Sequence, residues 1–122
     1  MTEAGLRLTL LITVLTVGSG IFDSLAFTYS SRMWQEGKLA LGPASKAAVT
    51  FSIGIALYWC AIRYLGEAGV VLPEIQTLIW FGVTIIGVAI IGGRLGDWQL
   101  IDQILGANVI LSLGWLITRT SA

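Results

Sequence analysis

The chain has 122 residues, of which 56% are hydrophobic and only 11% charged, and its mean hydropathy is +0.86. A soluble globular domain carries about 25% charged residues, so the composition predicts a membrane protein. Seven basic and seven acidic residues cancel, which argues against a nucleic-acid partner. The chain has no histidine and one cysteine, so we expect no metal site, no cofactor and no intramolecular disulfide.

Four apolar runs follow one another along the chain. Each is close to the length of about 20 residues that a membrane-spanning helix requires, and each is apolar on all faces, unlike the helices of a soluble bundle. The sequence therefore predicts an all-α integral membrane protein, a four-transmembrane-helix bundle forming a single domain over residues 1–122. The helices are expected at about 8–29, 47–65, 70–91 and 100–117.

The first run begins after Arg7 and passes through the small residues 18–20. Apolar character resumes at Ile21, so we expect a retained helix here and not a cleaved signal peptide. A polar loop is expected to follow over residues 30–45, with Gly37, Gly42 and Pro43 preventing a helix.

Asp23 lies inside the first apolar run. An ionisable group within a span costs at least a few kcal/mol unless it faces protein, water or a partner, and it is a functional-site hypothesis by default. Ser19 lies one helical turn away on the same face. Asp23 is therefore either a group that binds a cation or exchanges protons, or a structural carboxylate hydrogen-bonded to neighbouring helices.

Three further residues are candidates for the same pocket. Glu74 follows Pro73 near the start of the third run, where a carboxylate is also favoured by the helix dipole alone. Trp80 lies too deep for the interfacial aromatic belt, and its indole N–H needs a partner there. Tyr58 with Trp80 would suit a cationic organic molecule, although aromatic residues of membrane helices more often serve in packing or in the interfacial belt.

The basic residues are almost evenly divided between the two sides of a four-span protein. Arg7, Arg63 and Arg119 fall on the side of the termini, and four others fall on the opposite side, namely Arg32, Lys38, Lys46 and Arg94. Three against four gives no positive-inside bias. Either topology is then open: the chain inserts both ways and pairs as an antiparallel homodimer, or its insertion is decided by a partner or by one dominant helix.

The chain resembles the small multidrug resistance proteins and the wider drug/metabolite transporter superfamily, in layout over nearly all of its length and in local sequence best in its second half. The resemblance rests on Ile79-Trp80-Phe81-Gly82-Val83, on Gly92-Gly93-Arg94-Leu95 before the last helix, and on the seven-residue spacing of Ala107 and Gly114. In that family an essential glutamate in the first helix is shared by substrate and protons. Ser19 falls near its position and Asp23 one turn later, so the chain departs from the family there.

The resemblance implies a multi-pass protein of a prokaryotic inner (plasma) membrane. We expect a small transporter that moves a small, cationic or lipid-linked substrate, coupled to protons or ions through Asp23. The alternative is a non-transporting accessory subunit of a larger membrane complex, which the missing family glutamate favours. No phosphate loop and no nucleophile with a base is present in the sequence, so no enzymatic activity is expected. The expected partners are the lipid bilayer, a second copy or other membrane subunits, and a small-molecule substrate.

Overall fold

The computed structural model describes residues 2–93 and 95–120. Arg94 lies outside the described residues. It is one of the four basic residues expected on the side opposite the termini, and it is part of the sequence that resembles the transporter family. The described elements, in chain order, are α1 Glu3–Ser30, β1 Trp34–Gln35, β2 Lys38–Leu39, α2 Leu41–Glu67, α3 Pro73–Ile91, the short 3-10 helix η1 Leu95–Asp97, and α4 Leu100–Thr120.

Three of these helices are long and apolar enough to cross a membrane. They are α1, α2 and α3, with 28, 27 and 19 residues. The apolar part of α4 extends over Leu100–Leu116 and is shorter. The prediction of a largely helical chain is thus confirmed, and a fourth membrane span stays a prediction.

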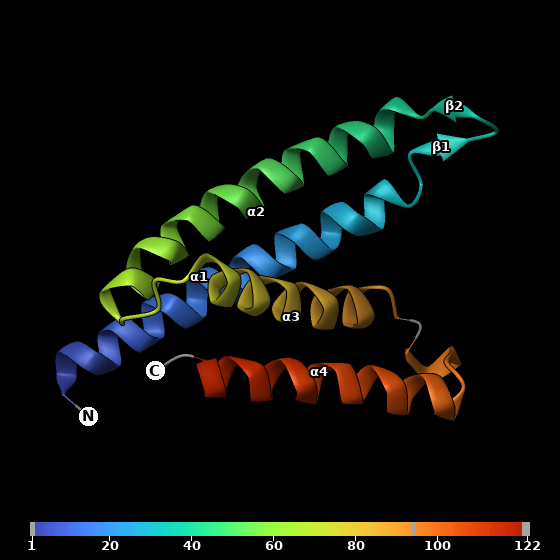
Figure 1. Cartoon of the computed structure of the whole chain (residues 1–122). Helices are drawn as coiled ribbons and strands as arrows, with labels where there is room; N and C mark the ends of the chain where they lie inside the picture. Colours follow the sequence, from blue (N-terminus) through green and yellow to red (C-terminus); the bar gives the residue numbers. More distant parts are fainter. Residues whose placement is uncertain (1, 94, 121–122) are drawn as a thin grey trace.

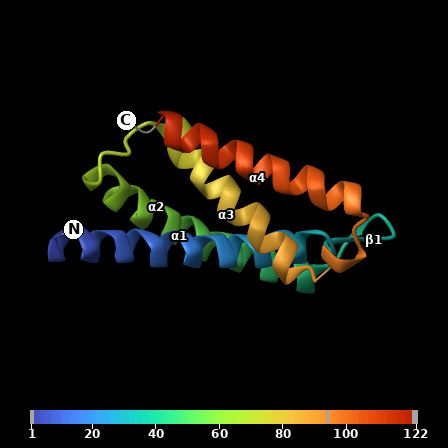
Figure 2. The ribbon, with the colours of Figure 1, turned by 90° about the horizontal axis from the view of Figure 1, so that it is seen from below.

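The helices run alternately in opposite directions (Figure 1). The first two, α1 and α2, lie side by side along most of their length, and α3 packs across α1. The last helix, α4, lies against α3 and away from the α1–α2 pair (Figure 2). The buried residues of α1 lie between positions 19 and 26, where α2 and α3 both meet it.

The first two helices both begin earlier than predicted. The first helix begins at Glu3, because the Thr2 hydroxyl accepts a hydrogen bond from the Gly5 backbone N–H at 3.0 Å and caps the helix. The second helix begins at Leu41, so Gly42 and Pro43 lie in its first turn and do not prevent it. A proline in the first turn is tolerated because the N–H groups there have no partner within the helix.

The expected irregular loop between α1 and α2 contains a hairpin. Trp34 pairs with Leu39 and Gln35 with Lys38, in antiparallel register. The two residues between the strands, Glu36 and Gly37, both have positive φ, at 54° and 76°. Positive φ at both central positions matches the right-handed twist of the strands, so the connection is tight.

The third helix starts at Pro73 and not near residue 70. Proline is favoured at this first position because its fixed φ suits the helix and its missing N–H is not needed. The Gln76 side-chain amide donates to the Val70 carbonyl oxygen at 2.9 Å and holds the preceding residues against the first turn. Pro73 therefore starts a helix and does not kink one, because no helix precedes this residue directly.

Candidate functional site

Asp23 is fully buried where α1, α2 and α3 meet, with a relative exposure of 0%. The Trp80 indole N–H, on α3, donates to Asp23 Oδ2 at 2.5 Å. The Ser19 hydroxyl lies 3.3 Å from the same oxygen and 2.8 Å from the Gly54 carbonyl oxygen on α2. A hydroxyl has one proton, so the shorter contact to Gly54 takes it and the contact to Asp23 is weaker. The indole is therefore the main donor to this carboxyl group.

Asp23 packs directly on the backbone of α2 at Gly54. A Cβ at position 54 would overlap Asp23 Oδ1 and come within 2.8 Å of its carboxyl carbon. Only glycine leaves room for the carboxyl group at this crossing. The absence of a side chain at Gly54 thus allows α1 and α2 to approach around a polar group.

Ser24, the next residue, makes the corresponding contact with α3. Its hydroxyl lies 2.5 Å from the Gly20 carbonyl oxygen and 3.2 Å from the Thr84 carbonyl oxygen, and the side chain is 0% exposed. A Cβ at Gly87 would overlap the Ser24 hydroxyl. Adjacent polar residues of α1 therefore link it to its neighbours, with Asp23 between α2 and α3 and Ser24 against α3.

Two polar atoms of this region lack a hydrogen-bond partner within the described residues. They are Asp23 Oδ1 and Thr84 Oγ1, and both are buried. Buried polar atoms are nearly always paired, and leaving one unpaired costs about 1–3 kcal/mol. Asp23 thus has one oxygen held by Trp80 and a second oxygen with spare acceptor capacity.

Aromatic rings surround the indole that holds Asp23. The centroids of Trp80 and Tyr58 are 6.1 Å apart with an interplanar angle of 51°. Phe81 meets Trp80 edge-on at 4.9 Å. The prediction that the deep indole N–H needs a partner is confirmed, since that partner is Asp23.

Four of the five predicted site residues form one cluster: Ser19, Asp23, Tyr58 and Trp80. The fifth, Glu74, is exposed and lies in the first turn of α3. Trp80 lies six residues later, which is about 9 Å along the helix axis. The structure does not bring Glu74 into the cluster, and its place in the first turn is the one that the helix dipole favours.

Three residues of this region were not predicted from the sequence, namely Gly54, Ser24 and Thr84. Ser24 had a local signal, because it is a polar residue directly beside Asp23 in an apolar run. Gly54 and Thr84 had none, since their contacts join residues that are 30 or more positions apart.

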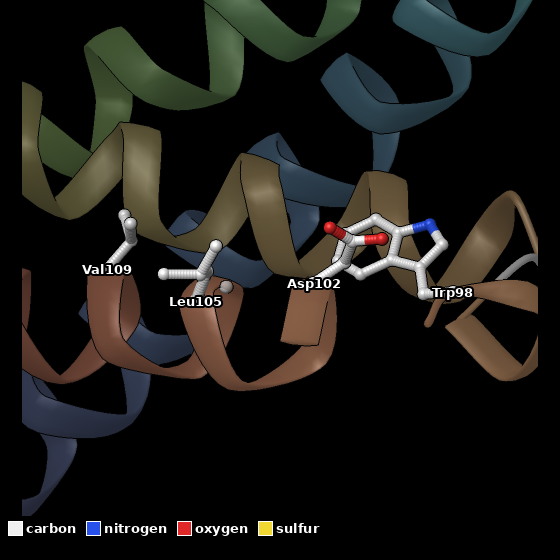
Figure 3. A pocket seen from close by; sticks show the side chains of 5 residues that line it. Trp98, Asp102, Leu105 and Val109 are labelled. Atoms are coloured by element: carbon white, nitrogen blue, oxygen red, sulfur yellow. The ribbon is translucent and has the colours of Figure 1, made fainter. Parts of the chain in front are cut away.

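A surface hollow of about 410 Å³ is separate from this cluster. It lies along the start of α4, where Trp98, Asp102, Leu105 and Val109 line it together with Gly106 (Figure 3). The Trp98 ring lies close above Gly106, where a Cβ would be 3.3 Å from Cζ3. None of the predicted site residues lines this hollow.

Within the described residues, no group of three or more His, Cys, Asp or Glu side chains is arranged to hold a metal ion. The chain matches no protein-family model, and searches of curated proteins and of solved structures find no match either.

Proposed function

We propose that the protein is an integral membrane transporter of the small drug/metabolite type, with four spans, in which Asp23 binds the substrate or the coupling ion. The observation that carries the proposal is the Asp23 carboxyl group itself. It is fully buried inside a helix apolar enough to span a membrane, and one of its oxygens has no hydrogen-bond partner in the described chain. Ionisable residues in such places mark substrate and ion pathways.

The surroundings of Asp23 suit an exchangeable ligand. Trp80 and Tyr58 supply aromatic faces beside the carboxyl group, and such faces attract organic cations. In the described conformation Gly54 closes the space in front of Oδ1. Binding of a ligand larger than a proton therefore requires α1 to move away from α2 at this crossing.

A homodimer completes the proposal. Every described side chain of α4 is exposed or, at Gln103, half-exposed, although the helix is largely apolar. A second copy in the membrane would cover this surface, and the balanced loop charges permit an antiparallel pair.

The test is transport by purified protein in proteoliposomes, with a pH-sensitive dye inside and the lipophilic cation tetraphenylphosphonium as the first probe. Asp23→Asn is the decisive variant, because an amide keeps the shape of the carboxyl group and still accepts from the Trp80 N–H. We expect Asp23→Asn to abolish coupled uptake and to leave the folded protein intact. Asp97→Asn, which removes an exposed carboxylate at η1, is the matched control and should transport normally.

Wild-type rates from folded protein carrying Asp23→Asn would remove Asp23 from the mechanism. If the unmodified protein moves neither the probe nor protons across a panel of organic cations and lipid-linked metabolites, the transporter proposal itself fails.

A second candidate function is an accessory subunit of a membrane complex. The closed packing around Asp23 favours it, because the Trp80 and Gly54 contacts also describe a purely structural carboxyl group. Purification in a gentle detergent separates the two functions. A fixed set of unrelated chains in constant ratio supports the subunit, and a dimer of this chain alone supports the transporter.

A further inference from the structure

A second hollow, of about 330 Å³, opens between the last turn of α1 and the start of α2. It is lined by Tyr29 on α1 and by four residues of α2: Ser45, Lys46, Val49 and Thr50. The ends of α1 and α2 that carry these residues are joined by the β1–β2 hairpin, at the end of the pair opposite to the N-terminus (Figure 1). None of these residues belongs to the Asp23 cluster.

The mouth of the hollow is positively charged. Lys46 Nζ lies 5.7 Å from the centroid of the Tyr29 ring, and within the described residues no carboxylate forms an ion pair with it. Arg32 and Lys38 lie on the same connection, where Glu36 is the one acid over residues 30–46. With Lys46 on α2, residues 30–46 hold three basic residues and one acidic residue, a net charge of +2.

Two of the three hydroxyl groups that line the hollow are free to bind a ligand. The Ser45 and Tyr29 hydroxyls form no hydrogen bond within the described part of the chain. The Thr50 hydroxyl, by contrast, donates to the Lys46 carbonyl oxygen of its own helix at 2.7 Å. The mouth thus offers an ammonium group and two hydroxyls, which together match the oxygens of a phosphate.

From the hollow, an apolar stripe continues along α2. Val49 lies one turn from Lys46 and is 58% exposed, and Ile53 continues the same face one turn further and is 39% exposed. Trp34, 67% exposed on the hairpin, is placed as an interfacial aromatic anchor. Charge at the mouth and an apolar stripe toward the middle of the helix match a headgroup followed by an acyl chain.

We propose that this hollow binds an anionic phospholipid, with its phosphate against Lys46, Ser45 and Tyr29 and an acyl chain along Val49 and Ile53. This proposal rests on the proposed membrane insertion, and it is independent of transport. The positive charge of Arg32 and Lys38 adds attraction for the negative headgroup. The lipid would bind at the outer surface of the α1–α2 pair and leave the Asp23 cluster closed.

The experiment is native mass spectrometry of the detergent-solubilised protein after equilibration with equal amounts of phosphatidylglycerol and phosphatidylcholine. We expect the unmodified protein to retain phosphatidylglycerol in preference. Lys46→Gln should lower that retention about fivefold, as expected for one basic group at an anionic surface. Lys46→Arg should restore most of it, and excess inorganic phosphate should not displace the lipid.

Arg7→Gln is the matched control, because it removes one positive charge from the exposed opposite end of α1. Equal retention of the two lipids, or equal retention by the Lys46→Gln and Arg7→Gln variants, would overturn the lipid site. Displacement by inorganic phosphate would overturn the contribution of the acyl chain. Extraction of the protein from membranes by alkaline carbonate is a separate readout, and release there would overturn membrane insertion as well.

Discussion

The region where α1, α2 and α3 meet around Asp23, called the cluster below, differs from α4 in where its polar residues lie. In the cluster, Asp23 and Ser24 are fully buried and link α1 to both neighbouring helices. Along α4, the acid Asp102 is exposed in the first turn, and the described side chains make few contacts with the rest of the chain. The two regions have similarly apolar sequences, so hydrophobicity alone does not explain which helices pack together.

The difference matters for apolar helices because, in a membrane, lipid would compete with protein for their surfaces. Lipid tails are as apolar as leucine, so association depends on close backbone approach and on hydrogen bonds between helices. The cluster has both, at the close contacts of Gly20, Gly54 and Gly87. In α4, Gly114 has nothing within 4 Å of the position of a Cβ. We therefore expect substitutions in the cluster to reduce stability and matched substitutions in α4 to have little effect.

The largest effect is expected from Gly54→Val. The new side chain would overlap the Asp23 carboxyl group and force α1 and α2 apart, at a cost of about 3 kcal/mol. Gly114→Val is the matched control and should change stability by less than about 0.5 kcal/mol. Unfolding of the monomeric protein in mixed micelles, followed by circular dichroism, measures both. Equal effects of the two substitutions would contradict the comparison between the cluster and α4.

A smaller loss is expected from Trp80→Phe. Phenylalanine keeps most of the ring packing but removes the N–H that donates to Asp23 Oδ2, which should cost about 1–2 kcal/mol. Trp115→Phe, at an exposed position of α4, should cost less than about 0.5 kcal/mol. The same unfolding measurement applies. A neutral Trp80→Phe variant would mean that the indole is not the main partner of Asp23.

The smallest change in stability, and one of opposite sign, is expected from Thr84→Val. The Thr84 hydroxyl is buried without a partner in the described chain, so replacing it with a methyl group should be neutral or stabilise the protein by up to about 1 kcal/mol. Thr118→Val in α4 removes an exposed hydroxyl that donates to the Trp115 carbonyl oxygen and should be neutral. Destabilisation by Thr84→Val beyond about 1 kcal/mol would show that this hydroxyl has a partner.

The helices were predictable because long apolar runs are set by local composition. Their starts were less predictable, as Gly42, Pro43 and the Val70–Leu72 segment show. Glycine and proline interrupt a helix in its interior, but in the first turn they do not, and composition alone does not distinguish the two positions. The hairpin was not predicted because its turn has a glutamate, Glu36, where asparagine, aspartate or glycine is usual.

The site was predictable in part. A polar group in an apolar helix needs a partner, and this rule identified Asp23, Ser19 and Trp80. The Trp80 N–H and the Asp23 carboxyl group are in fact hydrogen-bonded to each other. Gly54 was not identified, because its importance depends on which helix lies opposite and at what depth. Glu74 was proposed for the same pocket, but the start of α3 at Pro73 places it at the end of its helix, exposed.

The tight Glu36–Gly37 turn limits how Asp23 can become accessible. The paired strands join α1 to α2 at one end, whereas the other end of α1, from Glu3 to Gly18, has no fully buried residue. The two helices are thus joined by a short link at the hairpin end, whereas at the other end they are held only by side-chain packing, in which Ala61 and Leu65 of α2 are buried. If Asp23 binds a ligand as proposed, α1 and α2 have to separate at the end away from the hairpin, and a disulfide across that end would block entry without touching the carboxyl group.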